Sequence, residues 1–480
     1  MLSRASGKQL AEHVELLATS RNAAAVSIDH AIYRIELATG AKTLVDRNPD
    51  GFTRFLFDAA LRPAFAEKPT GDGGMLWFTP KPRGWAPFDT IGDVDAMATT
   101  ALEVSPDGRT VYALDSRGRD TAALVSIDLR TKASAPLATN VFADATSTIV
   151  DPATRVPIAA SFTYVLERWT ALDFEYQVDI DGVTSLVGGD DYHVVSQSAD
   201  DRTWIVQATS PQHPARYFAW DRVKHHGALL FSATPALDKA PLVPMHGVNV
   251  PTRDGLPMIG YLSLPNAIDP AGTGRASSPV PLVLLVHGGP WSRDRWGYSP
   301  VHQLLANRGY AVLSVNYRGS TGFGKRFTAA GDREWGKRMQ DDLLDAVGWA
   351  AVQGIARADR VAIAGGGYGG YAALMGMELA PDRFACGVDL DGFENLAALP
   401  KQLARRVGEA ASPLAHLAAI ERPLLVSHHG DAADAKQLVD NLTSRHVPVT
   451  EIADATEPAV FAAAEPFLAK CLGGSYEAGP

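Results

Sequence analysis

The sequence predicts two domains of different class: an all-β, propeller-like N-terminal domain over residues 1–244 and a doubly wound α/β domain over residues 245–480. In the first half, short alternating strands recur at a fixed interval, which is typical of a propeller. In the second half, apolar strands alternate with helical segments, which indicates a mostly parallel sheet with helices on both faces. A chain of 480 residues is long enough for two or more domains.

A weak internal repeat supports the propeller. The segment Ile32–Gly40 resembles Leu124–Lys132, which lies 92 residues further on, and Tyr217–Arg222 repeats the pattern after another 93 residues. Half of this offset, about 46 residues, matches the length of one four-stranded blade. Residues 10–240 therefore hold roughly five blades. A β-sandwich with accidental periodicity is the alternative interpretation.

The second half reads as alternating strands and helices. Three apolar runs suit strands that are buried on both faces, namely Val280–Val286, Ala311–Val315 and Val361–Ala364. The segments Asp341–Val352 and Ala435–Arg445 carry helical patterns between such strands. This alternation predicts the doubly wound sheet.

Composition excludes several classes of protein and partner. The net charge of −10 argues against a nucleic-acid or anionic-membrane partner. Two cysteines, Cys386 and Cys471, exclude a disulfide scaffold and fit a reducing compartment, and we expect both to pack as apolar side chains. The N-terminus shows no apolar stretch of the secretory type, and no run reaches the roughly 18 apolar residues of a membrane span. We therefore expect a cytoplasmic protein.

The most informative motif is a nucleophile elbow without a nucleophile. In α/β-hydrolases, a G-x-S-x-G turn between a strand and a helix presents the catalytic serine. Here Gly365–Gly369 follows an apolar run, opens a helical pattern and reads G-x-G-x-G. The nucleophile position is Gly367, which has no side chain. The second domain is thus expected to be an α/β-hydrolase fold. Glycine at this point also relieves the backbone strain of the turn.

Four motifs in order resemble the prolyl oligopeptidase family of serine peptidases, in its acylaminoacyl-peptidase-like branch. They are Gly365–Tyr371 (G-G-S-Y-G-G-Y in the family), His287–Trp291 (H-G-G-P), Asn316–Gly324 (N-Y-R-G-S-x-G-F-G) and Trp335–Asp342 (W-G…D-D). The resemblance implies a propeller joined to an α/β-hydrolase domain. The family's propeller usually has more than five blades, so we expect lost N-terminal blades and open strand edges that re-close or pair with another chain.

The family's catalytic serine, carboxylate and histidine follow in that order. The resemblance places the acid at Ala433, with Asp431 and Asp434 as displaced neighbours. The histidine is expected in a loop before the last helix, but no histidine follows His446, so that loop is expected to be deleted. No catalytic residue is therefore intact by this comparison.

The backbone groups that would hold a developing oxyanion are better preserved. They are the Tyr368 N–H and the N–H groups of Gly288 and Gly289. They favour a peptide or small carboxylate ligand, although these glycines also suit tight turns alone. The pair His428–His429 ends a strand and is read as structural. We expect no metal and no cofactor.

Two functions follow. The main expectation is a catalytically inactive pseudopeptidase that acts as a binding or interaction protein and can form a homo-oligomer through its N-terminal half. The alternative is a serine-type peptidase, or an acyl or ester hydrolase, with a rearranged active site. Fold alone does not choose between them.

Overall fold

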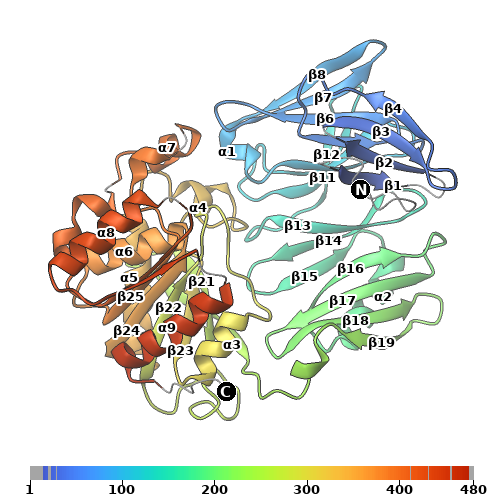
Figure 1. Cartoon of the computed structure of the whole chain (residues 1–480). Coiled ribbons are helices and arrows are strands. Elements are labelled where there is room, and N and C mark those ends of the chain that lie inside the picture. Colours follow the sequence, from blue (N-terminus) through green and yellow to red (C-terminus); the bar gives the residue numbers. More distant parts are fainter. Residues whose placement is uncertain are drawn as a thin grey trace.

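The computed structural model describes residues 14–474, apart from 20–22, 29, 400, 411, 431 and 455–456. It consists of a five-bladed β-propeller region and an α/β domain that lie side by side (Figure 1). The propeller region and the doubly wound domain are those expected from the sequence, and the β-sandwich alternative is wrong. The expected division after residue 244 falls directly before Met245, the first residue of the α/β sheet.

Each blade is an antiparallel meander in sequence order. The first three blades are β1 (Val14–Thr19), β2 (Ala23–Ile28), β3 (Ala31–Glu36) and β4 (Lys42–Asp46); β5 (Arg54–Phe57), β6 (Pro63–Pro69), β7 (Met75–Lys81) and β8 (Gly84–Ile91); and β9 (Thr100–Val104), β10 (Thr110–Asp115), β11 (Ala123–Asp128) and β12 (Ser134–Ala138). The last two are β13 (Ala145–Val150), β14 (Pro157–Thr163) and β15 (Glu167–Ala171); and β16 (Asp191–Gln197), β17 (Thr203–Ser210), β18 (His213–Asp221) and β19 (His226–Ser232).

Successive blades begin at residues 14, 54, 100, 145 and 191, which are intervals of 40, 46, 45 and 46 residues. The predicted period is therefore confirmed. The fourth blade has three strands, and helix α2 (Phe174–Leu186) follows them. Asp173 caps this helix by accepting a hydrogen bond from the Glu175 N–H.

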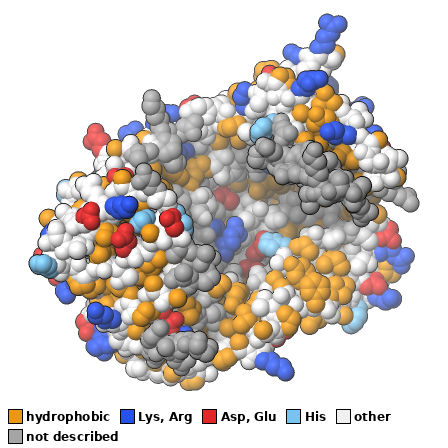
Figure 2. Space-filling view, viewed as in Figure 1, with side chains coloured by type: hydrophobic (Ala, Val, Ile, Leu, Met, Phe, Trp, Pro, Cys, Tyr) orange, Lys and Arg blue, Asp and Glu red, His pale blue; other side chains and the backbone are white. Residues whose placement is uncertain are grey.

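Apolar side chains hold neighbouring blades together. In β17 every second residue from Trp204 to Ser210 is buried, as the two-residue period of a strand requires. Shared apolar clusters join each blade to the next, for example Phe65 with Val111 and Ile158 with Trp204. Within the described part of the chain, no such cluster joins the fifth blade to the first. Hydrophobic side chains gather over the fifth blade (Figure 2), where Leu229 and Phe231 are more than half exposed.

The α/β domain is built on one eight-stranded sheet with the order β20-β21-β23-β22-β24-β25-β26-β27. The first two strands are antiparallel to their neighbours and the other six run parallel. The strands are β20 (Met245–Pro251), β21 (Pro257–Ser263), β22 (Val280–Val286), β23 (Ala311–Val315), β24 (Ala356–Gly366), β25 (Cys386–Leu390), β26 (Leu424–His428) and β27 (Val449–Ala453).

Helices cover both faces of this sheet. Helices α5 (Arg338–Val352), α6 (Tyr368–Leu379) and α8 (Ala433–Ser444) pack on one face, and α3 (Pro300–Asn307) and α9 (Glu457–Leu472) pack on the other. Shorter helices lie outside these layers, namely α1 (Asp93–Ala96), α4 (Lys325–Ala329) and α7 (Lys401–Val407), with 3₁₀ turns at Pro235–Leu237, Leu396–Ala398, Pro413–Ala415 and Leu417–Ala419. Within the described residues, no helix is both long enough and apolar enough to cross a membrane.

Polar contacts join the two domains. The Lys325 ammonium lies 2.8 Å from the Asp95 carboxylate, and the Arg293 guanidinium donates to the Thr163 and Tyr164 carbonyl oxygens at 2.8 and 3.1 Å. The Tyr261 hydroxyl donates to the Val165 carbonyl oxygen at 2.7 Å. The loops around the elbow are thereby held against the propeller.

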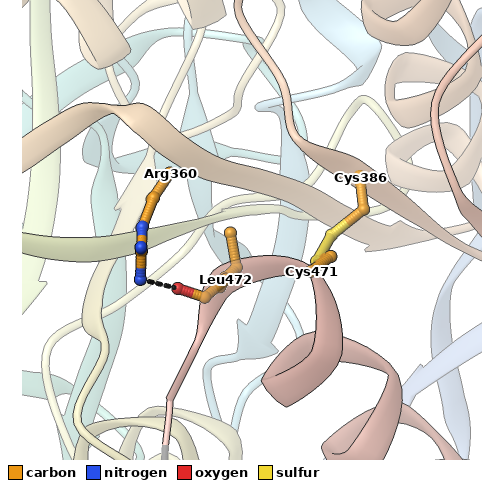
Figure 3. The surroundings of a disulfide bond; sticks show 4 residues. All are labelled: Arg360, Cys386, Cys471 and Leu472. Atoms are coloured by element: carbon orange, nitrogen blue, oxygen red, sulfur yellow. Dashed lines mark hydrogen bonds between the residues drawn. A yellow bond between two sulfur atoms is a disulfide. The ribbon is translucent and has the colours of Figure 1, made fainter.

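One expectation about the cysteines is wrong. Cys386 of β25 and Cys471 of α9 form a disulfide across 85 residues of chain (Figure 3). Both residues were expected to pack as separate apolar side chains. Their pairing follows from the sheet, because α9 folds back over the face on which Cys386 lies. Beside the disulfide, the Arg360 guanidinium donates to the Leu472 carbonyl oxygen at 3.0 Å and holds the end of the same helix.

Candidate active site

The elbow has the backbone of a nucleophile turn. It joins the end of β24 to the start of α6, and Gly367 between them has φ +56° and ψ −115°. A Cβ on Gly365 or Gly369 would lie 2.4 or 2.1 Å from the Val286 carbonyl oxygen, so glycine is required where helix and strand cross. A Cβ on Gly367 would meet no atom within 4 Å. The turn therefore leaves open space where the family carries its serine.

The loop after β22 borders this turn. A Cβ on Gly288 would lie 3.0 Å from the Gly366 carbonyl oxygen, and Gly289 has φ +119°. Tyr368 is the first residue of α6, where backbone N–H groups lack helical partners. These positions are suited to hold a carbonyl oxygen or a carboxylate.

Buried side chains fix that loop. The Tyr317 hydroxyl donates to the His287 carbonyl oxygen at 2.8 Å, and the His287 Nε2 lies 2.8 Å from the Ser320 Oγ. Burial lowers the pKa of His287 to about 4, so its imidazole is neutral near pH 7. We assign His287 and Ser320 to support of the loop, because Ser320 is fully buried.

Among the described residues, neither Ala433 nor Asp434 takes part in an acid–histidine pair of the family's kind. Ala433 is the exposed first residue of α8. Asp434 accepts a hydrogen bond from the Asn395 side-chain amide at 3.4 Å. Asp431 lies outside the described residues. At the other end of the chain, β27 ends at Ala453 and α9 begins at Glu457, so the connection that carries a histidine in the family is short here.

Sequence reasoning missed an acid–histidine pair elsewhere. His429 directly follows β26, and Asp391 directly follows β25. The His429 Nδ1 lies 2.9 and 3.0 Å from the two Asp391 carboxylate oxygens. The side chains are 58% and 46% exposed, so water and a substrate can reach them.

This pair lies beside the elbow. The Gly367 N–H donates to the Leu390 carbonyl oxygen at 3.0 Å, and Asp391 is the next residue. The Asp391 N–H in turn donates to the Ser427 carbonyl oxygen at 2.9 Å, two residues before His429. The carboxyl ends of adjacent parallel strands are where α/β folds gather functional groups. That rule is the sequence signal that could have drawn attention to Asp391.

The neighbouring His428 has a different role. It is 5% exposed, and its Nε2 lies 2.9 Å from the Glu451 carboxylate on the adjacent strand β27. This contact agrees with the structural interpretation of His428, whereas His429 points to Asp391. Across the described ranges, no three His, Cys, Asp or Glu side chains gather in a way that could hold a metal ion.

Comparisons with known proteins agree with the motifs. A profile of the prolyl oligopeptidase family matches residues 296–428. The chain is 40% identical to dipeptidyl aminopeptidase BIII of Pseudoxanthomonas mexicana, over 93% of this chain and 70% of that protein. It is 30% identical to dipeptidyl peptidase family member 6 of Caenorhabditis elegans, over 93% and 69%.

Solved structures show the same fold. A puromycin-hydrolyzing peptidase of Mycobacterium tuberculosis matches with a TM-score of 0.70 and 16% identity, over 97% of this chain and 87% of that one. Dipeptidyl peptidase 4 of Porphyromonas gingivalis matches with a TM-score of 0.69 and 15% identity, over 94% and 67%.

These findings correct the main functional expectation. An inactive pseudopeptidase was expected because three catalytic positions are changed, but the relatives that match nearly the whole chain are named as peptidases. The expectation interpreted His429 as structural and did not include its contact with Asp391. The chain belongs to the prolyl oligopeptidase family.

Proposed function

We propose that this protein hydrolyses peptide or related acyl bonds with a rearranged active site. In this site His429 and Asp391 carry out the acid–base chemistry, and the N–H groups of Tyr368 and the Gly288–Gly289 loop hold the carbonyl oxygen. The observation that carries the proposal is the His429–Asp391 contact of 2.9 Å beside the elbow. A carboxylate on one ring nitrogen orients a histidine and stabilises its protonated form.

The proposed reaction uses water as the nucleophile, since Gly367 has no side chain. Water attacks the carbonyl carbon while His429 accepts a proton from it, and the carbonyl oxygen becomes the oxyanion. The oxyanion then collapses, the bond from carbon to the leaving nitrogen breaks, and the proton on His429 passes to that nitrogen. The products are a carboxylic acid and an amine, and the histidine returns to its neutral form.

The open space at Gly367 supports this arrangement. No atom lies within 4 Å of the point that a Cβ would occupy, so a water molecule has room there. Positioned acid–base groups contribute about 10²–10⁴-fold to a rate. Oxyanion donors without a triad leave a residual catalysis of about 10³–10⁴-fold over water. We therefore expect slower turnover than that of an enzyme with a complete triad.

The substrate class follows from the relatives. Of two relatives that share most of this chain, one is named a dipeptidyl aminopeptidase and the other a dipeptidyl peptidase family member. We propose that short peptides are the substrates and that a dipeptide is released from the N-terminus. A panel of dipeptidyl p-nitroanilides tests both the reaction and the length preference, because single-residue and acetylated analogues serve as matched comparisons.

Variants link any activity to the proposed pair. His429→Gln and Asp391→Asn should each lower kcat/KM by about 10²-fold or more, since the first removes the base and the second removes the carboxylate that orients it. Asn tolerates the positive φ of 52° at residue 391, so the loop should keep its shape. His416→Gln, at an exposed histidine of the same domain, is the matched control and should leave kcat/KM unchanged. Activity that is equal in all four proteins would contradict the proposal.

The compartment is part of the proposal. The cysteine count favoured a reducing, cytoplasmic setting, but disulfides persist in oxidising compartments. The bond between Cys386 and Cys471 therefore favours an oxidising one. Thiol titration of denatured protein, taken from its natural source under alkylating conditions, distinguishes the two settings.

A further inference from the structure

A largely apolar cavity lies under the elbow, on the sheet face that α3 and α9 cover. Its volume is about 290 Å³. Strand residues such as Val283, Leu285 and Val388 form its floor, and Leu305, Ala464 and Leu468 from the helices form its roof. Cavities of this size and lining hold a single small apolar group.

One end of this cavity carries an unpaired acidic group. Asp294 borders the cavity, and its Oδ2 is buried without a hydrogen-bond partner among the described residues. Its backbone N–H donates to the Asn316 side-chain oxygen at 2.8 Å, which fixes the residue in place. A buried carboxylate oxygen without a donor is costly, so it favours a ligand that supplies one.

Neighbouring cations do not supply that donor. The Arg293 guanidinium donates to the carbonyl oxygens of Thr163, Tyr164 and Asp294 itself, at 2.8, 3.1 and 3.3 Å. Arg295 also borders the cavity, but its residue is exposed to solvent.

The two histidines at the cavity are neutral. His302 lies between two serine hydroxyls, 3.1 Å from Ser263 Oγ and 2.8 Å from Ser314 Oγ, and burial lowers its pKa to about 4. Burial likewise lowers the pKa of His287 to about 4. The buried polar end of the cavity is therefore set by Asp294.

We propose that this cavity is a binding site for a small hydrophobic amine, whose apolar group packs between the sheet and α9 and whose ammonium group pairs with Asp294. Burial raises the pKa of Asp294 to about 7, and this effect outweighs the opposing charge of the Arg293 guanidinium. An ammonium donor supplies both the missing charge and the missing hydrogen bond. Binding at this cavity requires no hydrolysis, so the binding proposal does not depend on the proposed reaction.

Three isosteric probes test the proposal by isothermal calorimetry on the full chain at pH 8. Phenethylamine should bind with a Kd of roughly millimolar or tighter, since it fills a preformed apolar site. Phenethyl alcohol and phenylacetate should bind about tenfold more weakly or worse, because neither offers an ammonium group to Asp294. The proposal is overturned if the three probes bind equally well or if phenylacetate binds best. It is also overturned if phenethylamine shows no binding at several times the roughly millimolar Kd expected for it.

Two variants locate the site. Asp294→Asn should bring the affinities for the amine and the alcohol to within about twofold of each other, because only the charge is lost. Ala464→Phe should abolish binding of both, since its ring fills the cavity from α9. Unchanged amine affinity in either folded variant would place the binding elsewhere. If Asp294→Asn fails to fold, the ranking of the three probes on the unaltered chain still decides the matter.

Discussion

Reduction of the Cys386–Cys471 disulfide should destabilise the α/β domain by a calculable amount. The bond closes a loop of 85 residues, and it ties α9 to the buried strand β25. The chain-entropy relation for a loop of that length gives about 4.6 kcal/mol at 25 °C. Measured values usually fall below this limit, so we expect a loss of between about 2 and about 4.6 kcal/mol.

Urea unfolding followed by tryptophan fluorescence, with and without reductant, measures this loss. The unfolding midpoint of the α/β domain should fall on reduction. The matched control is Cys471→Ala, which cannot form the bond and whose midpoint should not respond to reductant. The reasoning is refuted if reductant leaves the unaltered chain's midpoint unchanged, or if the denatured, unreduced protein titrates as two free thiols.

Three further outcomes are expected. Burial raises the pKa of Glu378 from 4.5 to about 8, so its stabilising contribution is complete below about pH 4.5 and is lost as the pH rises to about 8. The Glu378→Gln variant should lack this pH dependence, which amounts to up to about 1.4 kcal/mol of unfolding free energy per pH unit in that window. Urea midpoints at several pH values measure the difference, and parallel curves for the two proteins contradict it. Gly367→Ser should cost about 1–3 kcal/mol, because serine must adopt the strained turn even though space is available; equal unfolding midpoints would show that the turn is unstrained. Light scattering should detect self-association through the N-terminal half, because the fifth blade exposes Leu229 and Phe231; Phe231→Glu should weaken it, and a monodisperse monomer over the whole concentration range rules it out.

Features with a local signature could be predicted from the sequence. The blade period follows from strands and turns that recur within one stretch of chain, and the elbow follows from a glycine pattern of five residues, Gly365–Gly369. The strands β22 and β23 have the predicted bounds, because fully apolar runs suit a sheet buried on both faces. The predicted helices over 341–352 and 435–445 correspond to α5 and α8.

Features that join distant segments could not be predicted. The disulfide spans 85 residues, and the pair of Asp391 and His429 spans 38. Each depends on the order of strands in the sheet, which places β25 between β24 and β26. Helix α2 was missed for another reason, since it interrupts a regular array of strands after the third strand of its blade. The functional expectation failed at the same point, because the sequence does not show that His429 and Asp391 lie together.

The central claim, that His429 and Asp391 act together in hydrolysis, is tested most directly by a double-mutant cycle. The measurement is kcat/KM for the best dipeptidyl p-nitroanilide in the unaltered chain, His429→Gln, Asp391→Asn and the double variant. If the two residues form one acid–base unit, each single change should cost about 10²-fold or more, and the double variant should lose little beyond that. Losses that multiply in the double variant, or single variants as active as the unaltered chain, would contradict the claim.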